Sequence, residues 1–175
     1  MNEIGCYEEG KITELRLLGI GKGAEIGAAV AMEFNGTAYA PIHDLHGNVV
    51  CLIEANTGKT QEFYRYSAFG EESLYDQSGN PLQAALNPWR FSSKRTDSET
   101  RFVYFGRRYY DSNLGRWITS DPIGFEGGPN LYAYVLNNPL THIDLYRLYA
   151  PDSSGATKSG TQRLIQPEGH CLFHL

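Results

Sequence analysis

The stretch that most constrains the fold is Arg107–Leu148, because residues with special backbone requirements recur in it at short intervals. Glycine reaches positive φ without strain, proline fixes φ near about −65°, and Asn or Asp bonds back to its own backbone. Two aromatic runs, Val103–Tyr110 and Leu131–Val135, accompany the turns and need a covered face. Three turn signals carry the pattern: Asp111–Gly115, Asp121–Gly124 and Asn137–Pro139. The stretch therefore predicts a tightly defined backbone around aromatic side chains.

Composition favours one domain that is mainly β. The 175 residues include 12 Tyr, a side chain that fits a half-buried pleated surface while its polar tip meets water. The net charge of −5 argues against binding to nucleic acid or to an anionic membrane, since both interactions draw on a basic surface. Four arginines alternate with aromatic residues and are interpreted as a solvated strand face: Arg101, Arg107, Arg108 and Arg116.

Regular turn signals in the first half predict an antiparallel β-hairpin meander. Asn35-Gly36 lies between two apolar runs and is a strong hairpin signal, since both turn residues take positive φ. Further turns at Asp44–Asn48 and Asn56–Gly58 bound the expected strands Val49–Ile53 and Thr60–Tyr66. The regular spacing of these turns is typical of an up-and-down sheet.

The second half departs from this regularity. Residues 71–88 are expected to form a longer polar loop, which contains one more turn at Asp76–Asn80. Residues 89–94 and 102–110 then predict a second hairpin, with Trp89, Phe91, Phe102 and Tyr104 as its anchors. Residues 130–138 predict one short helix, because Asn130 can cap it, apolar residues follow at helical spacing, and Pro139 stops it.

One group of motifs resembles a known family. These motifs place particular residue types at particular spacings: Tyr109-Tyr110-Asp111, Gly115-Arg116-Trp117, Ser120-Asp121-Pro122, Gly124, Asn130-Leu131-Tyr132, Tyr134, Asn137-Asn138-Pro139 and Asp144. This pattern resembles the core of the RHS/YD-repeat family, the β-shell proteins that include polymorphic bacterial toxins, the C components of insecticidal toxin complexes and the animal teneurins. Upstream, Asp44–Val49 and Tyr64–Gly70 look like YD-repeat units.

The resemblance implies how the chain is organised. Residues 1–40 would supply N-terminal strands and the Asn-Gly hairpin, and residues 41–148 an RHS/YD-repeat shell with its core at 107–148. Residues 149–175 have linker composition and are expected to be a short flexible C-terminal tail. The implied function is a structural, encapsulating module: a C-terminal fragment of a secreted or surface shell protein of the polymorphic-toxin type, with a truncated tip. Expected partners are an upstream YD-repeat shell or the chain's own C-terminal cargo, with possible self-association through open strand edges.

The resemblance also implies an alternative function, intramolecular aspartic autoproteolysis. In toxin members, aspartates of this core cut after the leucine of a D-P-x-G-L motif, so Asp121, Asp111 and Asp144 are the candidate catalytic residues and Leu148 the cleavage position. Peptide hydrolysis by carboxylates needs two of them close enough to share a proton. Here the motif has Leu145 where the family has Pro, and Arg147 where it has Gly, which weighs against cleavage.

Purely structural roles for the same carboxylates stay open. Asp111 can cap its turn and pair with Arg116, and Asp121 can initiate the Pro-Ile-Gly turn. If Ser112–Gly115 is a simple turn, Asp111 faces Arg116 and Asp121 lies about five residues further along the strand. The two carboxylates are then roughly 17 Å apart, too far to share a proton. Sequence alone does not choose between these roles.

Other site signals are weak. Gly19–Ala24 satisfies a dinucleotide-binding pattern, but that reading needs a helix over residues 24–34, where the hairpin is predicted. Cys6, Cys51 and Cys171 are not spaced for a disulfide framework or a zinc site, and two histidines beside Cys171 lack a fourth ligand. We therefore expect no cofactor and no metal. The sequence shows no signal peptide and no membrane segment, whereas the resemblance implies a secreted or envelope-associated protein.

Overall fold

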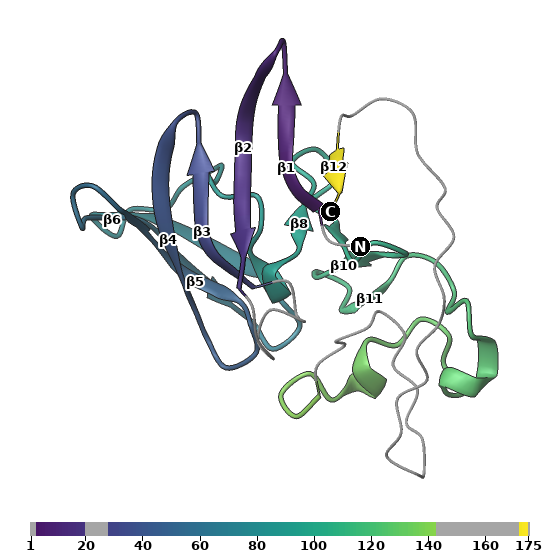
Figure 1. Cartoon of the computed structure of the whole chain (residues 1–175). Coiled ribbons are helices and arrows are strands. Elements are labelled where there is room, and N and C mark those ends of the chain that lie inside the picture. The colour runs from purple at the N-terminus through teal and green to yellow at the C-terminus, as the bar shows by residue number, and fades with distance from the viewer. Residues whose placement is uncertain (1–2, 20–27, 143–171, 175) are drawn as a thin grey trace.

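The computed structural model describes residues 3–19, 28–142 and 172–174, and they form two antiparallel sheets (Figure 1). The main sheet has eight strands in the order β12-β1-β2-β3-β4-β5-β6-β7, so β1 to β7 follow the order of the chain and β12 pairs with β1. Its strands are β1 Glu3–Glu8, β2 Lys11–Leu18, β3 Ala29–Phe34, β4 Thr37–His43, β5 Val49–Glu54, β6 Thr60–Tyr66, β7 Glu72–Asp76 and β12 Leu172–His174. The predicted mainly β meander is confirmed.

The second sheet is smaller and has the order β11-β10-β9-β8. Its strands are β8 Arg95–Thr96, β9 Val103–Tyr104, β10 Tyr109–Asp111 and β11 Arg116–Trp117. Three short 3₁₀ helices lie around it: η2 Phe91–Ser93, η3 Gly124–Gly127 and η4 Val135–Asn137. The predicted second hairpin is only partly strand. Residues 91–93 of its first arm form η2 and β8 begins after that arm, while its second arm is divided into β9 and β10.

Turn chemistry in the main sheet follows the sequence closely. Asn35 and Gly36 have φ of 49° and 81°, as a hairpin turn with two left-handed residues requires, and they join β3 to β4. The Asp44 carboxylate accepts hydrogen bonds from the His46 and Asn48 N–H groups at 2.8 and 2.9 Å. Asp76 repeats this arrangement in the turn that follows β7, so both Asp-x-x-Gly-Asn turns adopt one structure.

Alternation along the strands buries one face of the main sheet. On β6, Glu62 and Tyr64 are buried while Phe63 is exposed, and register places Tyr64 opposite the buried Leu74 of β7. The resulting core is one cluster: Ala29, Met32, Phe34, Tyr39, Val49, Leu52, Tyr64, Leu74 and Trp89. The ring of the fully buried Trp89 stacks on Phe34, which joins the segment after β7 to the sheet.

A second core packs under the small sheet. It consists of Phe91, Val103, Phe105, Tyr110, Trp117, Tyr134 and Val135. Tyr66 of the main sheet lies against this cluster, with its ring centre 5.9 Å from that of Phe91. The Tyr110 and Tyr134 rings are 4.5 Å apart at their centres, so residues from β10 and from just before η4 close the cluster. The aromatic core predicted from the sequence is therefore present.

Several expectations were wrong. Residues 71–88 are not one polar loop, because Glu72–Asp76 form β7 and pair with β6. The short helix predicted at residues 130–138 is reduced to the 3₁₀ helix η4 at residues 135–137. Ala133 instead forms a bridge with Arg116, and the N–H of Trp117 bonds to the carbonyl of Tyr132. Only η4 is helical in this stretch, and Leu136 within it has φ of 53°.

The structure also bears on the expected boundary at residues 40 and 41, on the tail and on the nucleotide-binding alternative. The expected boundary between residues 40 and 41 falls inside β4, and one sheet runs across it. Leu172–His174, part of the predicted flexible tail, form β12 because the edge of β1 offers backbone partners. The helix that a nucleotide site would need over residues 24–34 is contradicted by β3. The rest of the glycine-rich run and of the tail lies outside the described residues.

Candidate functional site

The family-matched aspartates lie on the turns that border the small sheet. Asp111 ends β10, is 9% exposed, and accepts hydrogen bonds from the N–H groups of Asn113 and Leu114 at 2.9 and 3.2 Å. Its partner across the hairpin is Arg116. The carboxylate thus satisfies the backbone of its own turn, which is the structural role that short polar side chains have in turns.

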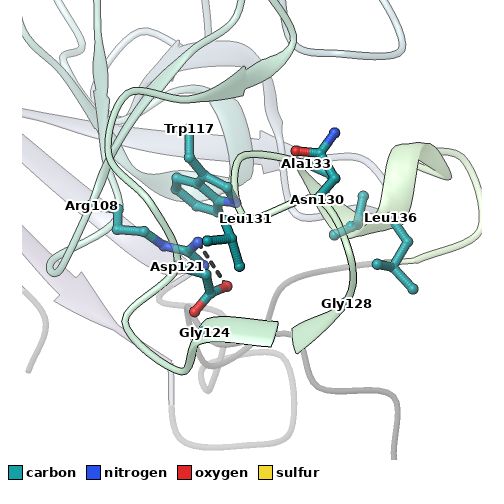
Figure 2. Close-up of a pocket in the computed structure, with 10 residues that line it drawn as sticks. Arg108, Trp117, Asp121, Gly124, Gly128, Asn130, Leu131, Ala133 and Leu136 are labelled. Atoms are coloured by element: carbon teal, nitrogen blue, oxygen red, sulfur yellow. Dashed lines mark hydrogen bonds and ion pairs between the residues drawn. The ribbon is translucent and has the colours of Figure 1, made fainter. Parts of the chain in front are cut away.

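Asp121 has a different environment, centred on Arg108 (Figure 2). One carboxylate oxygen accepts a hydrogen bond from Arg108 Nη1 at 2.8 Å, and the other accepts the Ile123 N–H at 3.0 Å. The Arg108 side chain is 2% exposed and that of Asp121 is 12% exposed. The guanidinium lies 4.0 Å from the centre of the Trp117 ring. An arginine, a carboxylate and an indole ring therefore form one compact, largely desolvated unit.

This unit overturns the interpretation of the four arginines as a solvated face. Arg101, Arg107 and Arg116 are exposed, but Arg108 is buried. A tight turn, in which the Phe105 N–H bonds to the Arg108 carbonyl, breaks the strand alternation just before Arg108. The side chain is therefore directed into the core.

The space beside Asp121 is small. A cavity of about 10 Å³ is lined by Arg108, Trp117, Asp121, Gly124, Gly128, Asn130, Leu131, Ala133, Val135 and Leu136. That volume is close to the minimum that holds one water molecule. It cannot admit a peptide or nucleotide, so any chemistry at this place would involve water and a neighbouring segment of chain.

The structure places Asp111 and Asp121, the two candidate aspartates among the described residues, in separate settings. Asp111 bonds to its own turn, and Asp121 bonds to Arg108 and the start of the next turn. Asp144 and the cleavage position Leu148 lie outside the described residues. Within the described part of the chain, the carboxylates of Asp111 and Asp121 are not bonded to each other, and the catalytic pair predicted from the sequence stays a prediction.

A buried carboxylate network on the main sheet was missed. Glu62 is 4% exposed, and it accepts hydrogen bonds from the Tyr64 hydroxyl and from the backbone N–H of Leu86 at 2.7 Å. Burial, reinforced by the Glu62 charge, raises the pKa of Tyr64 far above its usual range, so the phenol is a donor. Glu62 was detectable in principle, because it shares a face with Tyr64 in a strand that was predicted.

A second missed group is the ion pair between Glu72 and Arg90. Arg90 Nε and Nη2 donate to the two carboxylate oxygens of Glu72 at 2.7 and 2.6 Å, while Nη1 donates to the Asn87 carbonyl. Bidentate geometry of this kind fixes orientation as well as contributing energy. No local sequence signal links residues 18 positions apart, so this pair could not have been predicted.

Among the described residues, a groove of about 460 Å³ lies next to the second core. It is lined by Asp44, His46, Asn48, Val50, Tyr64, Arg65, Tyr66, Ser67, Ala68, Phe91, Ser92, Tyr134, Pro139, Leu140 and His142. In the same portion of the chain, no three His, Cys, Asp or Glu residues gather as they would around a metal ion. Nor does any helix there reach the length and apolarity that a bilayer crossing requires.

Parts of several bacterial toxin proteins are similar to this chain in sequence and in fold. No family model matches the chain. The toxin subunit YenC2 of Yersinia entomophaga is 43% identical over 84 residues, which is 48% of this chain and 8% of that protein. The tRNA3(Ser)-specific nuclease WapA of Bacillus spizizenii is 31% identical over 114 residues, or 63% of this chain and 5% of WapA. The solved TcdB2-TccC3 structure superimposes with a TM-score of 0.61 at 26% identity, covering 81% of this chain and 7% of that chain. This chain is an RHS-type segment.

The RHS segment is short beside its relatives. It aligns with 31% of the Escherichia coli protein YlbH, to which it is 45% identical over 75 residues and 40% of its own length. It spans well under half of each curated relative named above. The fold of the RHS segment is that of the shells in the solved toxin complexes, and the expected resemblance is confirmed.

Proposed function

We propose that this RHS segment is a structural part of a protein shell, in which the main sheet is wall and the second core closes its end. The supporting observation is the set of contacts made by Asp111 and Asp121. Each holds a turn, and Asp121 also neutralises a buried arginine beside a cavity of about 10 Å³. Groups engaged in this way stabilise a fixed backbone, which is what a shell end requires.

The shell proposal includes partners and location. The meander offers its wall to further YD-repeat strands of a longer protein, and the cargo of such a shell would be a C-terminal toxin domain. The tRNA nuclease activity of WapA would then belong to cargo, and we assign it to no residue of this segment. The net charge of −5 agrees with that assignment, since nucleic-acid binding draws on a basic surface. A secreted or envelope-associated location follows from the same resemblance.

A second candidate is autoproteolysis after Leu148, with Asp121 acting together with Asp111 or Asp144. The water-sized cavity beside Asp121 favours it, because a carboxylate next to water is the start of such a mechanism. Against it stands the occupancy of both Asp121 oxygens by Arg108 and the Ile123 N–H. The shell role accounts for these contacts directly.

The wall and its end must form one cooperative body if they make a shell. The chain has two tryptophans, Trp89 in the core of the main sheet and Trp117 in the second core, so each core can be followed separately. Replacing either one by Phe leaves a single fluorescent reporter. In each variant, we expect the urea midpoint from fluorescence to match the midpoint from far-ultraviolet circular dichroism. An end core that unfolds well before the sheet would contradict the proposal.

A further inference from the structure

The outer sides of β1 and β7 in the main sheet are covered in different ways. Outside β7, the Leu82 N–H bonds to the Leu74 carbonyl at 2.9 Å, and Pro81 forms a bridge with Tyr75. Proline has no N–H to offer, so a residue of this type blocks further strand pairing. The chain therefore closes the β7 edge with its own residues 81 and 82.

The β1 edge is covered much less firmly. Strand β1 has six residues, but its cover β12 has three, Leu172–His174, and it comes from the far end of the chain (Figure 1). The two paired positions are Glu3 with His174 and Cys6 with Leu172, and the register shifts between them. A short, irregular pair contributes little compared with β1 and β2, which pair from Gly5 to Glu8.

Charge indicates what kind of strand fits the β1 edge. The segment Glu3–Glu9 carries three carboxylates and no basic residue. On its inner side, Glu8 pairs with Lys11 at the end of β2. Opposite charges facing each other across strands are stabilising, and like charges are destabilising. A second copy of β1 in antiparallel register would bring carboxylates together, whereas a strand with basic ends would complement them.

We infer that β12 is a displaceable cover on the β1 edge, and that the edge accepts in its place an extended strand with Lys or Arg near its ends. The inference rests on the proposed shell function and adds a partner and a competing segment to it. Backbone hydrogen bonds would supply most of the affinity, and the basic ends would favour this strand over an acidic one. β12 and the incoming strand exclude each other because both need the same N–H and C=O groups.

The cover can be weakened without touching β1. Phe173→Pro in the full chain removes a backbone N–H and disfavours strand pairing, and Phe173→Ala is the matched control. The probe is a fluorescently labelled synthetic peptide with the sequence KITELRLL, which has Lys at one end, Arg near the other and apolar residues between. Fluorescence anisotropy should show about tenfold tighter binding to Phe173→Pro than to Phe173→Ala. Amide exchange of residues 4–8 should speed up in the proline variant and slow again when peptide is added.

Two controls make the result decisive. A peptide with Glu in place of Lys and Arg should bind at least about tenfold more weakly, and a chain that ends at Cys171 should behave as the proline variant does. Equal peptide affinity for Phe173→Pro and Phe173→Ala would overturn the role of β12. A concentration-dependent dimer of the proline variant, with no binding of the basic peptide, would overturn the partner chemistry. The single-tryptophan unfolding test is independent of β12, so failure of the shell function would be recognised separately.

Discussion

Arg108 and Asp121, 13 residues apart in the chain, are joined by a 2.8 Å ion pair in which the arginine side chain is almost completely buried. A buried charge is tolerated only when it is paired, so the pair ties the turn after β11 to the segment before β10. The Trp117 ring covers the guanidinium and belongs to the second core. The family-matched aspartate is thus built into the packing around the second core.

The first prediction concerns this ion pair. Asp121→Ala leaves the Arg108 charge buried without its carboxylate, and we expect the free energy of unfolding to fall by about 3 kcal/mol. Urea denaturation followed by circular dichroism measures the change. Glu126→Gln removes an exposed carboxylate in the neighbouring η3 and serves as the control, with almost no expected effect. A loss for Asp121→Ala no larger than that of the control would contradict the structural role.

The second prediction uses two glycines with nearly equal φ. Gly70 has φ of 85°, and a Cβ added there would lie 2.7 Å from the ring of Phe91, whereas Gly36 has φ of 81° and no atom within 4 Å of such a Cβ. Gly36→Ala should cost about 1 kcal/mol of stability, from backbone strain alone. Gly70→Ala should cost about 2–4 kcal/mol, because overpacking of the second core is added to the strain. Equal urea midpoints for the two variants would show that Phe91 moves away freely.

The third prediction compares the two equivalent turns. Asn48 bonds to Asp44 and also accepts the Ser92 N–H at 2.8 Å, so it links the first turn to η2. Asn80 makes the same contact to Asp76 in an exposed turn. Asn48→Ala should lower stability by about 2 kcal/mol, since it leaves a buried N–H without an acceptor. Asn80→Ala should have a clearly smaller effect, and the opposite order would contradict the docking role of Asn48.

The fourth prediction is a pH dependence set by His43. Burial lowers the pKa of His43 from its usual 6.5, and the nearby Asp44 carboxylate opposes this only in part. The folded chain therefore binds fewer protons at this site than the unfolded chain does. The stabilisation is fully present above pH 6.5 and decreases as the pH falls below it, toward the folded-state pKa.

His43→Gln should flatten that dependence. Urea midpoints measured from about pH 7.5 down to about pH 5.5 should fall less steeply in this variant than in the unmodified chain. His46→Gln, which changes the histidine within the Asp44–Asn48 turn that follows His43, is the matched control. Parallel pH curves for the unmodified chain and His43→Gln would rule out the proposed protonation.

Much of the main sheet could be predicted because its signals are local. A two-residue hairpin turn of this type needs positive φ at both positions, which Asn-Gly adopts readily, and Asn35 and Gly36 have it. Alternation along Thr60–Tyr66 likewise shows which side chains face the core, although the buried Glu62 on that face was overlooked. Where neighbours in sequence determine the conformation, the prediction succeeded.

The failures occurred where distant residues determine the conformation. Residues 131–135 have helical spacing, but their backbone pairs with β11, and Tyr134 is needed in the second core. The sequence pattern around Arg108 predicts a solvent-facing side chain, but the turn between Phe105 and Arg108 directs that side chain into the core. The partner of Asp121 follows from these same long-range arrangements. For this reason the sequence identified the residues of the candidate site without showing what they bond to.

The most direct test of the central claim is the intact mass of the purified chain during incubation for several days at physiological temperature. The shell account predicts one unchanged mass for the full chain and for Asp121→Asn, together with a lower urea midpoint for the variant. A new species that ends at Leu148 in the full chain, and is absent from Asp121→Asn, would contradict it and make Asp121 a catalytic residue.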